Sequence, residues 1–165
     1  ERKEIAKKVK NGEKVLVMFA GAAPYPIVIA RDSRAKVVYS NEINREANKY
    51  AELNIGLNKV KGRVVLLPGD IKRVAQKVKE KFDVIVMPRP QLKDMFLREA
   101  FSLSKKGTRI YYYDFCKEDE IKGIVNKIKS EALKSKKKIK ILKIKKAGEI
   151  APYRFRIRVD FEVLG

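Results

Sequence analysis

Short apolar runs alternate with amphipathic segments along the whole chain. The first apolar run covers residues 15–20, and a segment with helical spacing follows it from residue 24 to about residue 31. Continuous apolar runs are typical of parallel strands buried on both faces, whereas apolar residues three or four positions apart indicate helices. The pattern predicts further strands at 37–40, 64–67, 84–87 and 108–115, and further helices at 4–9, 44–57, 71–79, 92–104 and 118–135.

Two runs near the end of the chain, 139–145 and 155–163, alternate apolar and polar residues with period two. Such alternation suits an antiparallel pair at one edge of a sheet. Strands that alternate with helices and then close with this pair predict an α/β fold. We expect a doubly wound, Rossmann-like sheet, mostly parallel with an antiparallel edge strand. No repeat or linker divides the sequence, so we expect a single domain over residues 1–165.

The chain is strongly basic. Its 165 residues include 40 Lys and Arg against 20 Asp and Glu, which gives a formal charge of +20 and a pI of about 10.0. This charge favours a polyanionic partner, because each neutralised phosphate releases counterions. A solvated lysine-rich surface, as in proteins from hot environments, is the alternative. We favour nucleic acid.

The sequence has one cysteine and no histidine. This excludes disulfides, histidine-based catalysis and any ordinary zinc site, and we expect no metal. It contains neither a signal peptide nor an apolar stretch of membrane-spanning length. We expect a cytoplasmic protein with no membrane partner, and a monomer.

Small, acidic and stiff residues follow four successive strands of the predicted sheet. In such a sheet ligands bind outside the carboxyl ends of the strands, where small residues allow close approach and a carboxylate takes ribose hydroxyls. We expect Glu42 to accept the hydroxyls of a ribose and Asp70 to accept an adenine amino group. Ile43 and Ile71 would flank the ring. The predicted cofactor site is completed by Phe19, Ala20, Gly21, Ala22, Pro24 and Pro88.

Each of these acids alone is more often a helix cap or a surface charge, but together at successive strand ends they favour a site. The turn at 20–24 has one glycine and lacks the G-x-G-x-x-G pattern of dinucleotide sites, and no G-x-x-x-x-G-K-[ST] occurs. The sequence therefore gives no sign of a triphosphate site. S-adenosyl-L-methionine, a nucleoside without phosphate, fits the turn better.

Short motifs stand out from one end of the chain to the other. It opens with Glu1-Arg2-Lys3-Glu4-Ile5, and residues 17–25 read Val-Met-Phe-Ala-Gly-Ala-Ala-Pro-Tyr. Later come Glu42-Ile43-Asn44, the stretch 54–59, Gly69-Asp70, Tyr111-Tyr112-Tyr113-Asp114 and Ala151-Pro152-Tyr153-Arg154-Phe155. In combination they resemble the archaeal and eukaryotic-type tRNA guanine-37 N1-methyltransferase family, and its close relatives in wyosine synthesis, over almost the whole chain.

The resemblance implies a class I methyltransferase sheet with strand order 3-2-1-4-5-7-6. It also implies transfer of the methyl group of S-adenosyl-L-methionine to a guanosine, or a modified guanosine, beside the tRNA anticodon. A glutamate of the opening motif, here Glu1, is expected to take the proton from N1. A dry pocket that raised the affinity of this carboxylate for protons would suit that role. The expected substrate-binding residues are Asn44, Arg89, Pro90 and Tyr153.

The chain departs from the family pattern at three places. Val17 replaces an acidic residue, and Ala23 replaces a glycine, which is tolerable only where that residue avoids positive φ. Pro88-Arg89-Pro90 replaces an Asn-(Leu/Pro)-Pro motif, so the side-chain amide that would recognise guanine is missing. Two alternatives stay open: transfer of the aminocarboxypropyl group of the same cofactor, and a non-enzymatic RNA-binding module. The family's upstream RNA-binding part is not in this sequence, so we expect a fragment.

Overall fold

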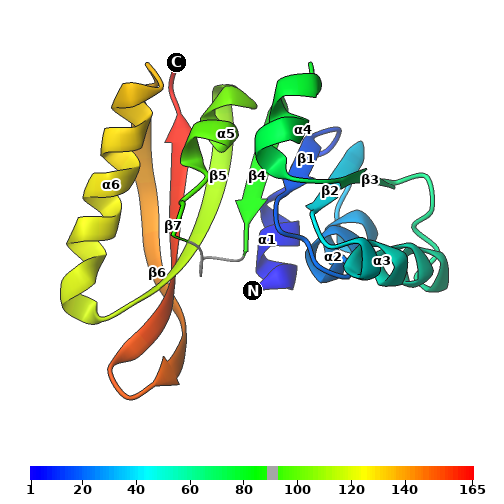
Figure 1. Ribbon diagram of the computed structural model, residues 1–165, viewed down its shortest axis with the longest axis horizontal. Coiled ribbons are helices and arrows are strands. Elements are labelled where there is room, and N and C mark those ends of the chain that lie inside the picture. Colours follow the sequence, from blue (N-terminus) through cyan, green and yellow to red (C-terminus); the bar gives the residue numbers. More distant parts are fainter. Residues whose placement is uncertain (89–92) are drawn as a thin grey trace.

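Seven strands form one sheet in the order β3-β2-β1-β4-β5-β7-β6, as predicted (Figure 1). The computed structural model describes residues 1–88 and 93–165. The strands are β1 (Lys14–Val17), β2 (Val37–Glu42), β3 (Val64–Pro68), β4 (Phe82–Met87), β5 (Ser104–Cys116), β6 (Ile139–Ala151) and β7 (Arg154–Val163). The helices are α1 (Arg2–Lys8), α2 (Pro24–Asp32), α3 (Arg45–Leu57), α4 (Ile71–Lys77), α5 (Leu97–Ser102) and α6 (Ile121–Lys134), with a 3-10 turn η1 (Glu118–Glu120) before α6.

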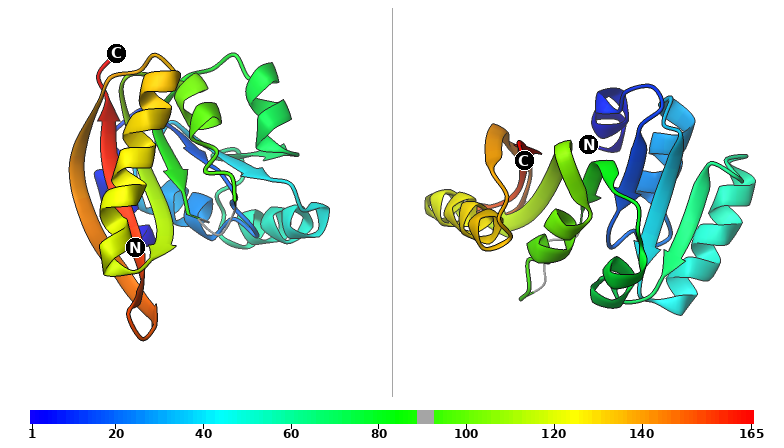
Figure 2. Two further views of the ribbon diagram at one scale, coloured as in Figure 1. Left: turned by 60° about the vertical axis from the view of Figure 1, so that its left-hand side comes forward. Right: turned by 90° about the horizontal axis from the view of Figure 1, so that it is seen from above.

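The central strands are parallel and buried on both faces. β1 pairs in parallel with β2 and with β4, and β4 pairs in parallel with β5. Successive residues of β1 belong to different core clusters: Val15 and Val17 pack with α1, α2 and α3, whereas Leu16 packs with α4, α5 and α6. Figure 2 shows α1 on one side of the strands and α4 and α5 on the other. Burial on both faces explains why these strands lack polar alternation.

The antiparallel pair at the edge is also confirmed, and it is longer than predicted. β7 runs antiparallel to both β5 and β6. The β6–β7 hairpin extends past the carboxyl ends of the parallel strands (Figure 1). The register of the pair shifts at three points, which increases the local twist. Pro152 and Tyr153 form the turn between Ala151 and Arg154.

The predicted helix at 92–104 is wrong over half of its described part, residues 93–104. Helix α5 covers only Leu97–Ser102, and β5 already begins at Ser104. Phe96 takes a left-handed conformation with φ 54°, which blocks an earlier start, and the Asp94 carboxylate accepts its backbone N–H at 2.8 Å. The strand predicted at 15–20 likewise ends at Val17, because Phe19 has φ 57°.

Within the described residues, no helix is both long and apolar enough to cross a bilayer. Nor do three or more Cys, Asp or Glu side chains of this part gather in a way that could hold a metal ion.

Candidate active site

The carboxyl ends of β1, β2 and β3 border a pocket of about 190 Å³. Five residues of the predicted cofactor site meet there, although they come from three separate segments of the chain. The lining residues are Phe19, Asn41, Glu42, Ile43, Gly69, Asp70, Ile71 and Phe96. A small pocket with largely apolar walls and a few convergent polar groups is the usual form of a small-molecule site.

Glu42 ties two of these segments together. Its side chain is almost buried, at 6% exposure. One carboxylate oxygen accepts the backbone N–H of Gly21 at 2.9 Å, and the other accepts that of Asn44 at 2.8 Å. A carboxylate has about four lone-pair sites, so each oxygen can still accept a ligand hydroxyl. Glu42 can therefore hold the turn and bind a ribose at once.

Asp70 lies at the facing end of β3. One carboxylate oxygen caps α4 by accepting the backbone N–H of Lys72 at 3.0 Å. The following residue, Ile71, is buried, whereas Ile43 is 64% exposed at the rim. The pair predicted to flank a ring thus has one buried and one open member.

Two aromatic rings form one wall of the pocket; Phe19 was predicted as a cofactor residue, whereas Phe96 was not. Phe19 and Phe96 meet edge to face with ring centroids 5.1 Å apart, and both line the pocket. The sequence pattern placed Phe96 on the inner side of a helix. Asn41, also missed, donates its side-chain amide to the carbonyls of Leu67 at 2.9 Å and Gly69 at 3.1 Å, which fixes the end of β3.

The turn between β1 and α2 combines left-handed backbone with close packing. Gly21 has φ 59°, and Ala23 has φ 69°, so Ala23 does not avoid positive φ as the sequence argument required. The carbonyl of Ala22 accepts the Asn54 side chain at 3.2 Å. Pro24 occupies the first position of α2, where its missing N–H costs nothing.

Glu1 lies outside this pocket, in a cluster of charged side chains. One of its carboxylate oxygens accepts from the Tyr113 hydroxyl at 2.9 Å and from the Arg158 guanidinium at 2.7 Å. The other accepts from the Lys145 ammonium at 2.7 Å. Arg158 is fully buried, and it also donates to Glu4 at 3.0 Å and to Asp160 at 2.6 Å.

These contacts set the protonation of the cluster. Burial alone would raise the pKa of Glu1, but hydrogen bonds from Lys145 and Tyr113 and the charge of Arg158 outweigh it and leave the pKa below its usual value. Hydrogen bonds from Arg158 and Lys145 lower the pKa of Glu4 to about 2. The expected rise in the proton affinity of Glu1 is therefore wrong, because the pocket around it is charged.

A chain of contacts connects Glu1 to the end of β4. The Tyr113 hydroxyl that binds Glu1 belongs to a ring on which the Arg156 guanidinium stacks at 4.3 Å. Arg156 in turn donates to the carbonyl of Pro88 at 3.0 Å. Pro88 does not line the pocket. It lies where β4 ends, one residue after Met87.

The predicted substrate-binding residues lie apart from one another. Asn44 is the N-cap of α3, and its side-chain oxygen accepts the N–H groups of Glu46 and Ala47, so the cap already uses it. Tyr153 is 82% exposed at the tip of the β6–β7 hairpin. Arg89 and Pro90 lie outside the described residues.

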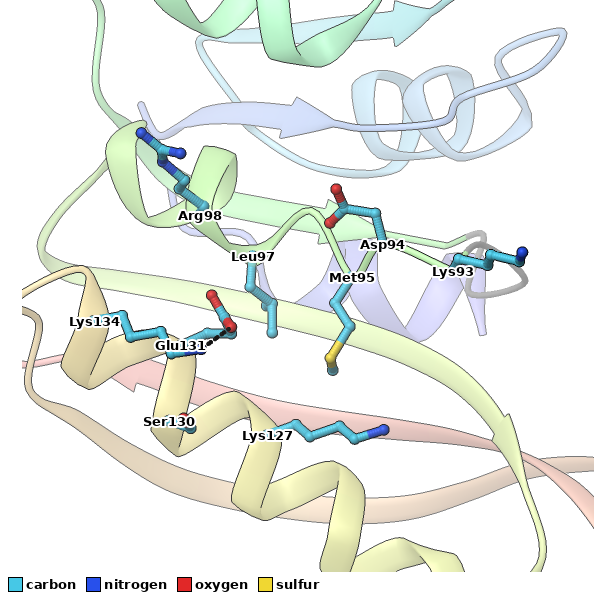
Figure 3. Close-up of a pocket in the computed structure, with 9 residues that line it drawn as sticks. All are labelled: Lys93, Asp94, Met95, Leu97, Arg98, Lys127, Ser130, Glu131 and Lys134. Atoms are coloured by element: carbon cyan, nitrogen blue, oxygen red, sulfur yellow. Dashed lines mark hydrogen bonds and ion pairs between the residues drawn. The ribbon is translucent and has the colours of Figure 1, made fainter.

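A larger hollow of about 410 Å³ lies between α5 and α6 (Figure 3). Met95 points into it from the segment before α5. Its charges are mixed: Glu131 pairs with Lys134 at 3.3 Å, and Asp94 pairs with Lys72 at 2.6 Å. None of the predicted site residues lines it. We therefore place the candidate site at the strand ends.

Comparison with known proteins gives one family. Residues 1–142 match the family described as the TRM5/TYW2 methyltransferase domain. Trm5b of Pyrococcus abyssi, a tRNA (guanine(37)-N(1))-methyltransferase, is 35% identical over 164 residues, which cover 99% of this chain and 48% of that protein. This chain thus spans about half the length of that relative. A tRNA(Phe) (4-demethylwyosine(37)-C(7)) aminocarboxypropyltransferase of Methanocaldococcus jannaschii is 29% identical over 161 residues, 97% of this chain and 64% of that protein.

Solved structures agree. The crystal structure of Trm5b from Pyrococcus abyssi matches with a TM-score of 0.88 and 34% identity, over 99% of this chain and 48% of that one. TYW2 of M. jannaschii in complex with AdoMet matches with a TM-score of 0.83 and 27% identity, over 98% of this chain and 74% of that one.

Proposed function

Because the chain belongs to the TRM5/TYW2 methyltransferase domain family, we propose that it binds S-adenosyl-L-methionine and methylates a guanosine, or a modified guanosine, at position 37 of tRNA. The observation that carries this proposal is the pocket at the strand ends. It joins Glu42 and Asp70, at the ends of neighbouring strands, to the apolar side chains of Phe19, Ile71 and Phe96. Carboxylates suit the ribose hydroxyls and the adenine amine, and the apolar side chains suit the ring.

When bound, S-adenosyl-L-methionine supplies an electrophilic methyl group on a sulfonium. Glu42 would accept hydrogen bonds from the ribose hydroxyls, and Asp70 would accept one from the adenine amino group. Phe19, Ile71 and Phe96 would shield the ring from water, with Ile43 at the rim. Glu1 would accept the proton that N1 of the target base loses when the methyl group passes to it from the sulfur.

The tRNA would approach from the side of the sheet where the β6–β7 hairpin extends beyond the strand ends (Figure 1). Tyr153 at its tip offers an exposed ring on which an unstacked base can lie. The flanking Arg154 and the net charge of +20 favour contact with phosphates. Arg89 and Pro90 stay candidates for contact with the target base.

Aminocarboxypropyl transfer is the second candidate, because a relative that is 29% identical over 97% of this chain carries that activity in its name. Val17 is fully buried in the core, so no charge stands where the family pattern expects an acidic residue. This feature instead favours the remaining alternative, an RNA-binding module without enzymatic activity. Both reactions use the same cofactor and differ in the carbon that the nucleophile attacks.

One experiment distinguishes these functions. Full-length protein is incubated with unmodified tRNA and S-adenosyl-L-methionine, and the nucleosides are analysed by mass spectrometry. A methylated guanosine at position 37 supports the proposal, and the heavier aminocarboxypropyl adduct supports the second candidate, for which tRNA carrying 4-demethylwyosine is tested in parallel. If neither tRNA changes while the protein binds it, the chain is an RNA-binding module without this activity.

A further inference from the structure

The structure buries one arginine completely in a protein whose surface is rich in lysine. Arg158 has no exposed area, and it contacts three carboxylates through all of its guanidinium nitrogens. Removing a charge from water costs several kcal/mol, which close and well-directed partners have to offset. A hydrophobic residue of similar volume would fill the same space without this desolvation cost, so stability alone does not account for Arg158.

The charges of this network do not balance. Its members are the carboxylates of Glu1, Glu4 and Asp160 and the cations of Arg158 and Lys145. Three negative and two positive charges leave one negative charge in excess. One proton would neutralise this excess charge, while the two cations keep the carboxylates ionised until a proton reaches them.

Glu1 is the member best placed to receive it. Its two oxygens are oriented by Tyr113 from β5, Lys145 from β6 and Arg158 from β7. Through Tyr113 and Arg156 the same carboxylate connects to the carbonyl of Pro88, where β4 ends. Glu4 and Asp160 bind other nitrogens of Arg158, whereas the Tyr113 hydroxyl donates to Glu1.

We infer that Arg158, together with Lys145, is a positioning residue that keeps Glu1 ionised and fixed in one orientation beside the end of β4. Glu1 can then take the proton that leaves the target nitrogen. The electron pair of the N–H bond stays on that nitrogen as its bond to the transferred carbon forms. This inference rests on the proposed function, since it assumes a nucleophile that loses a proton.

The groups around Glu1 keep it ionised and able to accept a proton, although they also make it a weaker base than a carboxylate in a dry pocket would be. The hydrogen bonds from Lys145 and Tyr113 and the charge of Arg158 keep the pKa of Glu1 low in spite of burial. Burial, followed by hydrogen bonding to Tyr25, raises the pKa of Tyr113, so this hydroxyl remains a donor to Glu1. Glu1 is then a carboxylate throughout the neutral range.

The test uses Lys145→Met, because Lys145 is partly exposed and its loss should not prevent folding. The rate of single-turnover transfer to tRNA is measured against pH. We expect the acid limb of the profile to move up by about one pH unit, because one cation beside Glu1 is gone. Lys146→Met is the matched control, since Lys146 forms an ion pair with Glu118 at 3.1 Å, away from Glu1. Its profile should match that of the wild type.

A second pair of variants tests the arginine itself. Arg158→Met is expected to lower the transfer rate about a hundredfold, with the affinity for S-adenosylhomocysteine unchanged within about twofold. Arg158→Lys should restore part of the rate. If the wild type transfers the group but neither the pH profile of Lys145→Met nor the rate of Arg158→Met changes, the inference is wrong and the proposed function stands. A wild type that binds the cofactor and tRNA but transfers nothing overturns both.

Discussion

Three aromatic residues of this chain, Phe19, Phe96 and Tyr153, adopt positive φ, which their β carbons disfavour. Each such conformation costs about 1–3 kcal/mol and persists only where the surroundings impose it. Phe19 and Phe96 pack edge to face in the wall of the pocket that also contains Glu42 and Asp70. The strain therefore coincides with the carboxylates and marks this pocket independently of them.

Glu42 is the residue whose loss should affect the cofactor most. In Glu42→Gln one oxygen is replaced by an amide N–H₂ group that faces the backbone donor of Gly21 or Asn44. We expect the dissociation constant for S-adenosylhomocysteine to rise about tenfold to a hundredfold, because hydrogen bonds to a charged acceptor contribute about 1.5–3 kcal/mol. Isothermal titration calorimetry measures this change. Glu46→Gln on the exposed side of α3 is the control, and equal affinities for all three proteins would contradict the assignment.

At Asp70 a substitution can separate helix capping from ligand binding, because serine also caps helices well. Asp70→Ser should keep the cap of α4 and remove the carboxylate that is expected to accept the adenine amino group. We predict an affinity for S-adenosylhomocysteine about tenfold lower and a thermal unfolding midpoint close to that of the wild type. A midpoint that falls while the affinity stays the same would show that Asp70 only caps the helix.

At the scale of elements, the turn between β1 and α2 depends on a left-handed backbone conformation at Gly21, and a substitution there measures the cost of that conformation. Gly21 has φ 59°, and a β carbon there would meet no atom within 4 Å. Gly21→Ala should therefore destabilise the protein by about 1 kcal/mol through backbone strain alone. Gly56→Ala is the matched control, because Gly56 lies in α3 and a β carbon there would also meet no atom within 4 Å. This substitution should stabilise the protein by about 0.5–1 kcal/mol. Urea unfolding of both variants gives the comparison, and effects of the same sign would refute it.

In the turn of the β6–β7 hairpin, relief of backbone strain should stabilise the protein, because the strained residue, Tyr153, buries almost none of its surface. Tyr153 has φ 62° and is 82% exposed. Asparagine tolerates this conformation, so Tyr153→Asn should stabilise the protein by about 1 kcal/mol. It should also weaken tRNA binding, because base stacking on an aromatic ring is worth about 1–3 kcal/mol. Fluorescence anisotropy with labelled tRNA measures the second effect; unchanged affinity would mean that the ring does not contact RNA.

The strands were predicted well where a short apolar run is bounded by turn residues. The run at 84–87 is such a case, and the run at 15–20 gave the strand but placed its end three residues too late. The order of the strands came from the family resemblance. The helix expected at 92–104 shows where the apolar pattern fails. Met95 and Phe96 have the spacing from Ala100 and Leu103 that a helix would give, but they precede α5. Their side chains pack against the core from a turn in which the Asp94 carboxylate accepts the backbone N–H of Phe96. Apolar spacing does not encode such a left-handed residue.

At the scale of the whole molecule, the Glu1 cluster joins the two ends of the chain. Glu1 and Arg158 are 157 positions apart, and no local pattern relates them. Arg158 and Asp160 occupy polar positions of the alternating segment 155–163. They are nevertheless buried, at 0% and 3% exposure, because Glu1 and Glu4 at the start of the chain pair with Arg158 on that face of β7. A contact between distant segments can reverse the inside and outside of a strand, and a pattern read along the chain does not contain it.

The Glu1 cluster should make the free energy of unfolding depend on pH in the acid range. The pKa of Glu4 falls to about 2 in the folded protein, and that of Glu1 is also lowered, from ordinary values near 4.5. The unfolded chain therefore binds these protons more readily, so the stabilisation is complete above about pH 5 and is lost as the pH falls from 4.5 towards 2. The loss of other carboxylate charges also increases repulsion in a protein of charge +20. High salt screens the long-range repulsion between exposed charges, but it has little effect on the ion pairs of the buried cluster.

We therefore predict that, in about 1 M salt, the free energy of unfolding declines between pH 5 and pH 2 and that Glu4→Gln makes this decline shallower. Glu4→Gln is also less stable than the wild type at neutral pH, because Arg158 and Lys145 lose a charged partner. Glu46→Gln, on the exposed face of α3, should follow the wild-type slope. Urea titrations at each pH measure all three. Parallel slopes for Glu4→Gln and the wild type would mean that the pairing of Glu4 with Arg158 and Lys145 contributes nothing to acid stability.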